Sequence, residues 1–108
     1  MDKRKLTPEG AVTRAIRDVL KLAGILHWKQ HQGLGSTPGV SDIIGIYQGR
    51  FLAIEVKAPG KRVKPMSRQQ GFLDNVHLHG GIAIEADSVE ALVDGFMRYG
   101  YKLPTFLF

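Results

Sequence analysis

Two apolar runs separated by only two residues constrain this chain more than any other feature of its sequence. The runs DIIGIY (residues 42–47) and RFLAIEVKA (residues 50–58) each have the length and composition of a β-strand. Gln48 and Gly49 lie between them, and a glycine between two such runs is typical of a tight β-hairpin. The sequence therefore predicts two antiparallel strands joined by a short turn.

The predicted turn determines which side chains face each other. With a two-residue loop Tyr47 lies opposite Arg50, and Asp42 then lies opposite Glu55. A four-residue loop gives the same pairing, whereas a three-residue loop shifts it by one. Opposed side chains have Cβ atoms about 4.5 to 5.5 Å apart, and two carboxylates at that spacing are destabilising unless a positive charge lies between them. A hard divalent cation is the natural candidate.

Three more polar residues are expected near this pair. Lys57 shares a face with Glu55 because strand side chains alternate, and its ammonium could hold or deprotonate a water molecule, or offset charge on a phosphate. Glu9 and Gln69 fall on the apolar stripes of two predicted helices, where a polar side chain needs a partner. Simpler interpretations stay open: a first-turn glutamate that favours the helix dipole, and a structural ion pair between the acids and the lysine.

Apolar periodicity predicts three helices and two further strands. Thr7 caps the first helix, Ser67 caps the second, and Asp87 with Glu90 has the spacing of a capping box for the third. The element order is αβββαβα, which predicts one domain, residues 1–108, of the α/β class with a mixed sheet flanked by helices. The expected helices are 8–23, 67–79 and 87–99, and the further strands are 25–32 and 82–86.

Positive charge is concentrated in one segment. The 108 residues include 15 Lys and Arg against 10 Asp and Glu, a net charge of +5. No acidic residue lies between Val56 and Leu73. A polyanionic partner such as DNA fits this segment, although the charge alone is equally typical of a solvated loop. The basic residues concerned are Lys57, Lys61, Arg62, Lys64 and Arg68.

Composition excludes several other classes of protein. The chain contains no cysteine, so it has neither a disulfide framework nor a thiolate zinc site. No apolar run approaches the roughly 18 residues needed to span a bilayer, and no export leader is recognised. We therefore expect a cytoplasmic protein without a membrane partner.

Aromatic and histidine side chains share the first predicted strand, residues 25–32. For His27 and His31, partial burial and contact with DNA are both open. We interpret Trp28 as a core residue rather than as a platform on which bases stack.

The motifs, taken in order, resemble those of a nuclease family. They run from Glu9 through GVSD (residues 39–42) and EVK (residues 55–57) to SRQQGFL (residues 67–73). An Asp that opens a strand, a hairpin and then EVK is the pattern of the PD-(D/E)XK nuclease superfamily. The whole layout resembles its VRR-NUC (virus-type replication-repair nuclease) branch, in the stand-alone form of phages and bacteria. Ser41 stands where the superfamily name has proline.

This resemblance covers nearly the whole chain and implies a fold and a set of roles. The fold implied is a restriction-endonuclease-like αβββαβ core with a C-terminal helix. Lys57 would be catalytic, and a glutamine of the later helix would assist; Gln69 and Gln70 are both candidates, and the helical phase favours Gln69. The metal would be Mg²⁺, with Mn²⁺ as a substitute. The implied metal ligands are Glu9, Asp42, Glu55 and the main-chain carbonyl of Val56.

These features together predict a metal-dependent endonuclease that hydrolyses phosphodiester bonds in DNA. The resemblance favours branched or structured DNA such as Holliday junctions, in a bacterial or phage-infected cell. Two other classes stay open: a DNA-binding module that kept the fold without the chemistry, and an assembly protein whose charges form only an ion-pair network. The residues expected to contact phosphates are Lys61, Arg62, Lys64 and Arg68.

The C-terminal residues, YKLPTFLF, predict a homodimer. A chain end normally frays, and large apolar side chains left in water there would form an adhesive patch. Either these side chains pack back on the core of their own chain, or they bury against a second copy. We favour the second copy, because a core this small has limited room for more aromatic side chains, and a two-fold dimer would present two sites of opposed polarity to a branched junction. The apolar residues concerned are Tyr101, Leu103, Phe106, Leu107 and Phe108.

Overall fold

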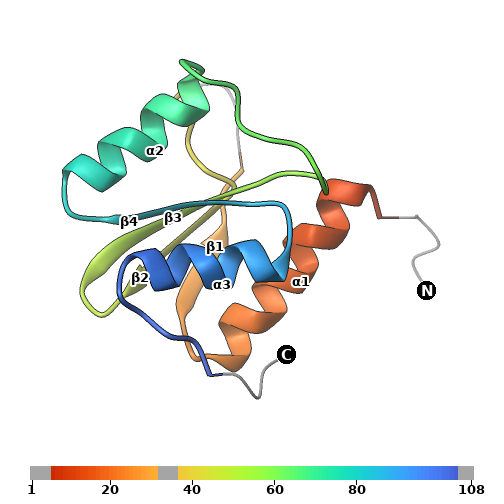
Figure 1. Ribbon diagram of the computed structural model, residues 1–108, viewed down its shortest axis with the longest axis vertical. Helices are drawn as coiled ribbons and strands as arrows, with labels where there is room; N and C mark the ends of the chain where they lie inside the picture. The colour runs from red at the N-terminus through yellow and green to blue at the C-terminus, as the bar shows by residue number, and fades with distance from the viewer. Residues whose placement is uncertain (1–5, 32–36, 105–108) are drawn as a thin grey trace.

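The computed structural model describes residues 6–31 and 37–104. It contains a single mixed sheet in the order β1-β2-β3-β4, in which β1, β2 and β3 are antiparallel and β4 is parallel to β3 (Figure 1). The predicted α/β class and the predicted order of elements are confirmed. The elements are α1 (Pro8–Leu22), β1 (Leu26–Lys29), β2 (Ile43–Tyr47), β3 (Arg50–Val56), α2 (Arg68–Leu78), β4 (Ile82–Ala86) and α3 (Val89–Arg98).

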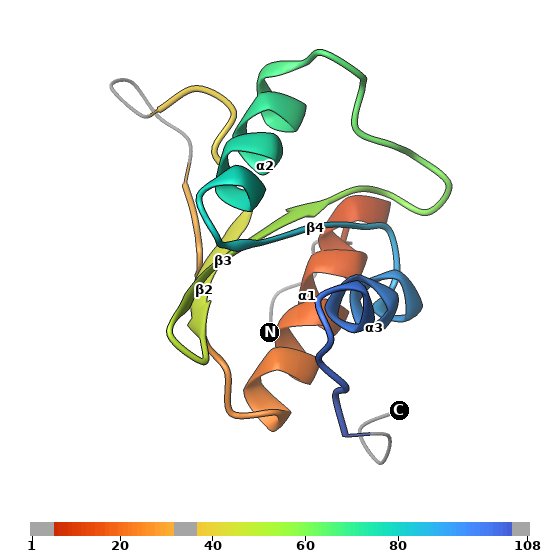
Figure 2. The same cartoon turned by 60° about the vertical axis from the view of Figure 1, so that its left-hand side comes forward.

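Helices cover both faces of the sheet, but unequally. Both α1 and α3 pack on one face, while α2 lies alone on the other (Figures 1 and 2). The larger core forms on the first face, where Ile16 and Phe96 are fully buried. The smaller core, with Leu73 and Val76 of α2, lies over β3 and β4. Strand β3 is therefore covered on both faces from residue 52 to residue 56, which buries Glu55 along with the apolar residues there.

The hairpin between β2 and β3 has the predicted turn. Gln48 and Gly49 both have positive φ, 49° and 78°, the backbone of a two-residue type I′ loop. Tyr47 pairs with Arg50, and the register continues to Ile43 opposite Ile54. The next pair along the register, just beyond β2, is Asp42 and Glu55. The predicted pairing of these two acids is confirmed.

Two of the three predicted helix caps are confirmed, and the third is wrong. The hydroxyl of Thr7 accepts from the N–H of Gly10 at 2.9 Å, and the hydroxyl of Ser67 accepts from the N–H of Gln70 at 3.1 Å. At α3 the cap is Ser88, which accepts from Ala91. Asp87 is turned away from the helix toward a neighbouring loop, which removes it from the cap.

The C-terminal tail packs in part on its own core. Leu103 is only 2% exposed, and the Tyr101 ring packs edge-on against Tyr47 at 5.0 Å. For these two residues the structure therefore shows packing on the chain's own core, not the favoured burial against a second copy. Residues 106–108 lie outside the described residues. In the described ranges, no helix is long and apolar enough to cross a membrane.

Candidate active site

Two acids meet at the end of the β2–β3 hairpin, on the face of the sheet that carries α2. Asp42 precedes β2 directly, and Glu55 lies near the end of β3. The N–H of Val56 donates to Oδ2 of Asp42 at 2.8 Å, which fixes this carboxylate beside the neighbouring strand. The carbonyl of Val56 lies on the same edge of β3 as its N–H, so it also points to the Asp42 side.

Glu55 is a buried acid that lies against a second carboxylate. Its side chain is 3% exposed, and within the described residues its Oε1 has no hydrogen-bond partner. Burial, followed by the charge of Asp42 and a hydrogen bond between the two side chains, raises the pKa of Glu55 to about 8. At neutral pH Glu55 therefore keeps its proton. A divalent cation could take the place of that proton.

Glu9 lies near this pair without being buried. Its negative charge contributes to the raised pKa of Glu55, so the first turn of α1 lies at the same end of the sheet. The side chain itself is exposed, because the buried stripe of α1 begins one turn later, at Val12. The expectation that Glu9 sits on the buried stripe is therefore wrong.

Lys57 and Gln69 approach each other beside the acids. The Nζ of Lys57 donates to Oε1 of Gln69 at 3.4 Å, and in the described part of the chain it forms no ion pair with either acid. Gln70 points elsewhere, since its Nε2 donates to Oδ1 of Asp74 at 2.8 Å. Of the two candidate glutamines, Gln69 is the one that faces the site. An ion-pair network of Lys57 with the acids is not what the structure contains.

A hollow of about 380 Å³ opens beside the acid pair, between the sheet and the beginning of α2. Arg68 and Gln69 line it from the helix, opposite Asp42 and Glu55. Gly39 closes another wall: its φ is +79°, and a Cβ there would lie 2.3 Å from the carbonyl oxygen of Arg68. A larger residue would force this loop off α2 and widen the hollow.

The donor atoms suit a hard divalent cation. Asp42 and Glu55 provide carboxylate oxygens, one of them buried and unpartnered, and the carbonyl of Val56 lies on the same side. Magnesium is often held by only one or two carboxylates, with water and phosphate oxygens as the other ligands. Nevertheless, no group of three or more Asp, Glu, His or Cys side chains in residues 6–31 and 37–104 is arranged to hold a metal. Glu9 thus contributes charge rather than a third converging ligand.

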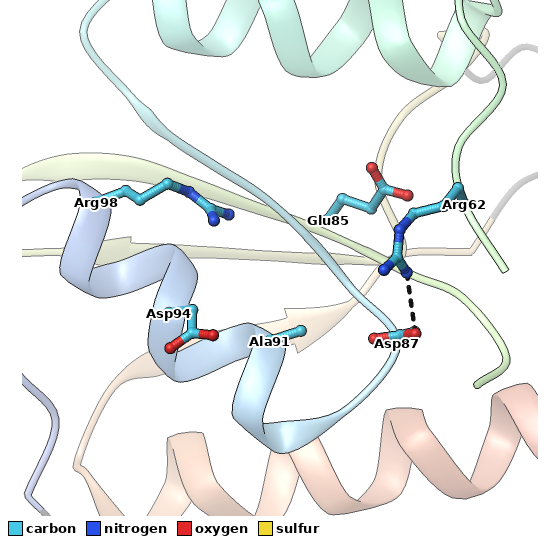
Figure 3. Close-up of a pocket in the computed structure, with 6 residues that line it drawn as sticks. All are labelled: Arg62, Glu85, Asp87, Ala91, Asp94 and Arg98. Carbon is cyan, nitrogen blue, oxygen red and sulfur yellow. Dashed lines mark hydrogen bonds and ion pairs between the residues drawn. The ribbon is translucent and has the colours of Figure 1, made fainter. Parts of the chain in front are cut away.

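The four basic residues expected to bind phosphate are not gathered in one place. Arg68 lines the hollow beside the acids, and Lys61 and Lys64 are exposed on the loop between β3 and α2. Arg62 turns to the other side of β4, where it forms an ion pair of 3.0 Å with Asp87. There it lines a second hollow, with Asp94 and Arg98 of α3 across from it (Figure 3).

Sequence reasoning missed the two acids that hold this loop. Oε2 of Glu85 accepts from the N–H of Val63 at 2.5 Å, and Oδ2 of Asp87 accepts from the N–H of Gly60 at 2.9 Å. The Gly60 N–H and the Arg62 guanidinium lower the pKa of Asp87. The sequence IAIEA (residues 82–86) could have indicated Glu85, because side chains alternate along a strand and Glu85 interrupts an apolar run as Glu55 does. In the structure Glu85 pairs with Glu55 and lies on the same face of the sheet.

No protein-family model matches the chain, and no curated protein matches it significantly. The resemblance to VRR-NUC nucleases therefore stays a prediction from the motifs. The geometry by itself defines a buried Glu55 carboxyl against the half-buried Asp42, with a lysine and a glutamine beside them, at the edge of an open hollow.

Proposed function

We propose that this protein is a metal-dependent endonuclease that hydrolyses phosphodiester bonds in DNA, with Mg²⁺ as its cofactor and Mn²⁺ as a substitute. The observation that carries the proposal is the buried carboxyl of Glu55 against the half-buried Asp42, which holds a proton where a cation would fit. Placing a buried acid beside a second acid is costly, and an isolated structural role gives no reason for it. The motif resemblance to VRR-NUC nucleases and their restriction-endonuclease-like fold supports the same function.

Each residue around the hollow has a separate role in the proposed hydrolysis. Asp42 and Glu55, with the carbonyl of Val56, would hold the metal, which when bound polarises the phosphate and lowers the pKa of water. The Nζ of Lys57 lies where it can hold the attacking water and offset negative charge on the phosphate. Gln69 orients that ammonium through its Oε1. Arg68, at the rim of the same hollow, would bind a neighbouring phosphate.

The substrate class that we propose rests on the motif resemblance. Branched or structured DNA, such as a Holliday junction, is favoured by the resemblance and would be met in the cytoplasm of a bacterial or phage-infected cell. Exposed Lys61 and Lys64 could follow the phosphates that flank the hollow. A homodimer would place two such sites on one substrate.

Cleavage of a panel of linear, flapped and four-way DNA, with Mg²⁺ and with EDTA, tests the proposal. We expect Mg²⁺-dependent cutting, and we expect Lys57→Ala to lower its rate by about a hundredfold or more without changing the melting temperature. Lys21→Ala, which removes an exposed lysine from the end of α1, is the matched control and should cut normally. Full activity of the Lys57 variant would remove this residue from the mechanism.

A second candidate function is a DNA-binding module without catalysis. It is favoured by the exposed position of Glu9 and by the lack of three converging ligands in the described residues. This candidate predicts binding to the same DNA panel with no cleavage in Mg²⁺ or Mn²⁺. Cleavage abolished by Asp42→Asn would exclude it.

A further inference from the structure

Within residues 6–31 and 37–104, no helix covers the part of one sheet face that is formed by β1 and β2. Helix α2 packs over β3 and β4, and the same face continues across β2 and β1 without a helix (Figure 1). In register order, Leu26 of β1 lies beside Ile46 of β2, and Ile46 lies beside Phe51 of β3. Their side chains are 62%, 47% and 45% exposed. A contiguous apolar surface of this kind marks a place where something binds.

Trp28 belongs to this surface. It pairs with Ile44, which is buried under α2, so its indole is on the α2 face, yet it is 44% exposed. The interpretation of Trp28 as a core residue is therefore wrong, because α2 does not extend over β1. The indole Nε1 donates to Oε1 of Gln30 at 3.3 Å, which holds the ring in one orientation. The result is a flat, oriented and half-exposed aromatic side chain.

The apolar surface is continuous with the candidate active site. The N–H of Gln30 donates to the carbonyl of Asp42 at 2.7 Å, so β1 runs alongside the acid. Trp28 is two residues before Gln30 and is thus diagonal to Asp42, a relation that separates Cβ atoms by about 7 to 8 Å. Nucleotides along one strand of a duplex are about 3.4 Å apart. A base one or two nucleotides from a phosphate in the hollow could therefore reach the indole.

The chemistry of the two neighbouring surfaces matches a nucleotide that is not base-paired. Arg68 lines the hollow, and the Nζ of Lys57 reaches Gln69 at its wall, so positive charge that suits a phosphate lies there. The indole and the aliphatic side chains around it suit the flat face of a base. In an intact duplex that face is hidden by stacking, and only an unpaired base can present it.

We propose that Trp28, with Leu26, Ile46 and Phe51 around it, is a stacking surface for an unpaired base next to the phosphate that is cleaved. The proposal rests on the proposed nuclease function and gives it a substrate class: DNA that contains single-stranded nucleotides at a flap, gap or branch. Fully paired linear DNA would lose this contact and bind more weakly.

Trp28 is the only tryptophan of the chain, so its fluorescence reports on this surface alone. In EDTA, where no cleavage is expected, a single-stranded oligonucleotide should quench the emission, and a duplex of the same sequence should not. A single strand with several consecutive abasic positions keeps its phosphates but lacks bases at those positions, and it should quench less. Equal quenching by the duplex and the single strand, or no quenching by either, would overturn the proposal.

Substitutions separate stacking from general binding. By anisotropy of a labelled single strand, Trp28→Leu should weaken binding about tenfold or more, and Trp28→Phe should restore most of it. Binding to duplex should change little in both variants. Leu22→Ala is the matched control, since Leu22 is 67% exposed at the end of α1. An equal loss for single strand and duplex would overturn the stacking role.

The same samples distinguish failure of stacking from failure of the nuclease. Mg²⁺-dependent cleavage without quenching would leave the nuclease function and overturn the stacking surface. Quenching by single strands without any cleavage would support the stacking surface and remove the nuclease function. A blue shift of the emission on concentrating the protein without DNA would assign the surface to a second copy of the chain and overturn the proposal.

Discussion

At the scale of single residues, the protonation of Glu55 is the most informative feature of the site. Its ordinary pKa of 4.5 is raised to about 8, first by burial and then by Asp42. A raised pKa means that the folded protein holds a proton that the unfolded chain has already released. The proton of Glu55 thus offsets charge at the acid pair, and under the proposed function a metal ion would take its place.

Stability without metal should therefore fall as the pH rises between about 4.5 and 8, the ordinary and raised pKa values of Glu55. Below this window both states hold the proton, and within it only the folded state does, so the slope is at most about 1.4 kcal/mol per pH unit. Urea unfolding in EDTA at several pH values measures it. Glu55→Gln should remove this slope, because the amide does not titrate.

Glu90→Gln is the matched control for this measurement, because Glu90 is an exposed glutamate of α3. This variant should keep the slope of the wild type. Millimolar Mg²⁺ at pH 8 should raise the melting temperature of the wild type but not that of Glu55→Gln. The same slope in the Glu55 variant and in the wild type would contradict the assigned pKa.

At the scale of elements, the loop between β3 and α2 is the segment through which the fold presents positive charge. Figure 2 shows it projecting beyond the end of β3 before it returns to α2. Glu85 and Asp87 hold it through the N–H groups of Val63 and Gly60. Val63 is 6% exposed and packs in the smaller core. The loop is thus anchored at its middle, while Lys61 and Lys64 are exposed where they could meet a partner.

Neutralising Lys61 and Lys64 together should reduce the salt dependence of DNA binding. Each phosphate contact contributes about 0.9 to the slope of log K against log salt on duplex DNA, so the double alanine variant should lower that slope by about 2. Arg62→Ala should leave the slope nearly unchanged, because Arg62 is paired with Asp87. Binding titrations at several salt concentrations check both. An unchanged slope in the lysine variant would place the DNA on another surface.

At the scale of the whole molecule, the C-terminal tail still predicts a homodimer, but fewer of its residues are left for the contact between copies. Tyr101 and Leu103 belong to the core of their own chain, so only residues 106–108 are left as the proposed contact. Light scattering at micromolar concentration should give the mass of a dimer. Removing residues 105–108 should give a folded monomer, since the packed part of the tail remains.

Two results would count against this expectation. A monomeric wild type would exclude the dimer at these concentrations, and a dimeric truncated protein would show that another surface holds the copies together. Leu103→Ala serves as a comparison, because it removes a buried side chain and should lower stability by about 2 to 5 kcal/mol. That loss should be absent from the truncated protein.

The sequence by itself determined the hairpin, its register and the pairing of Asp42 with Glu55. Turn chemistry and strand alternation are local, and Gln48 with Gly49 allows the two-residue loop that sets every pair after it. The caps Thr7 and Ser67 were determined in the same way, from the hydrogen bond each makes within one helical turn.

Only the tertiary structure decided which of these side chains are covered. Periodicity predicts on which face of its helix or strand a side chain lies. Whether that side chain is buried depends on whether another element packs against that face. Glu9 shares the direction of the buried stripe of α1 yet is exposed, because the stripe is covered only from Val12 onward. Trp28 lies on the face that α2 covers, but α2 ends over β3 and β4. Arg62 is drawn away from the acid pair by Asp87, a residue 25 positions later in the chain.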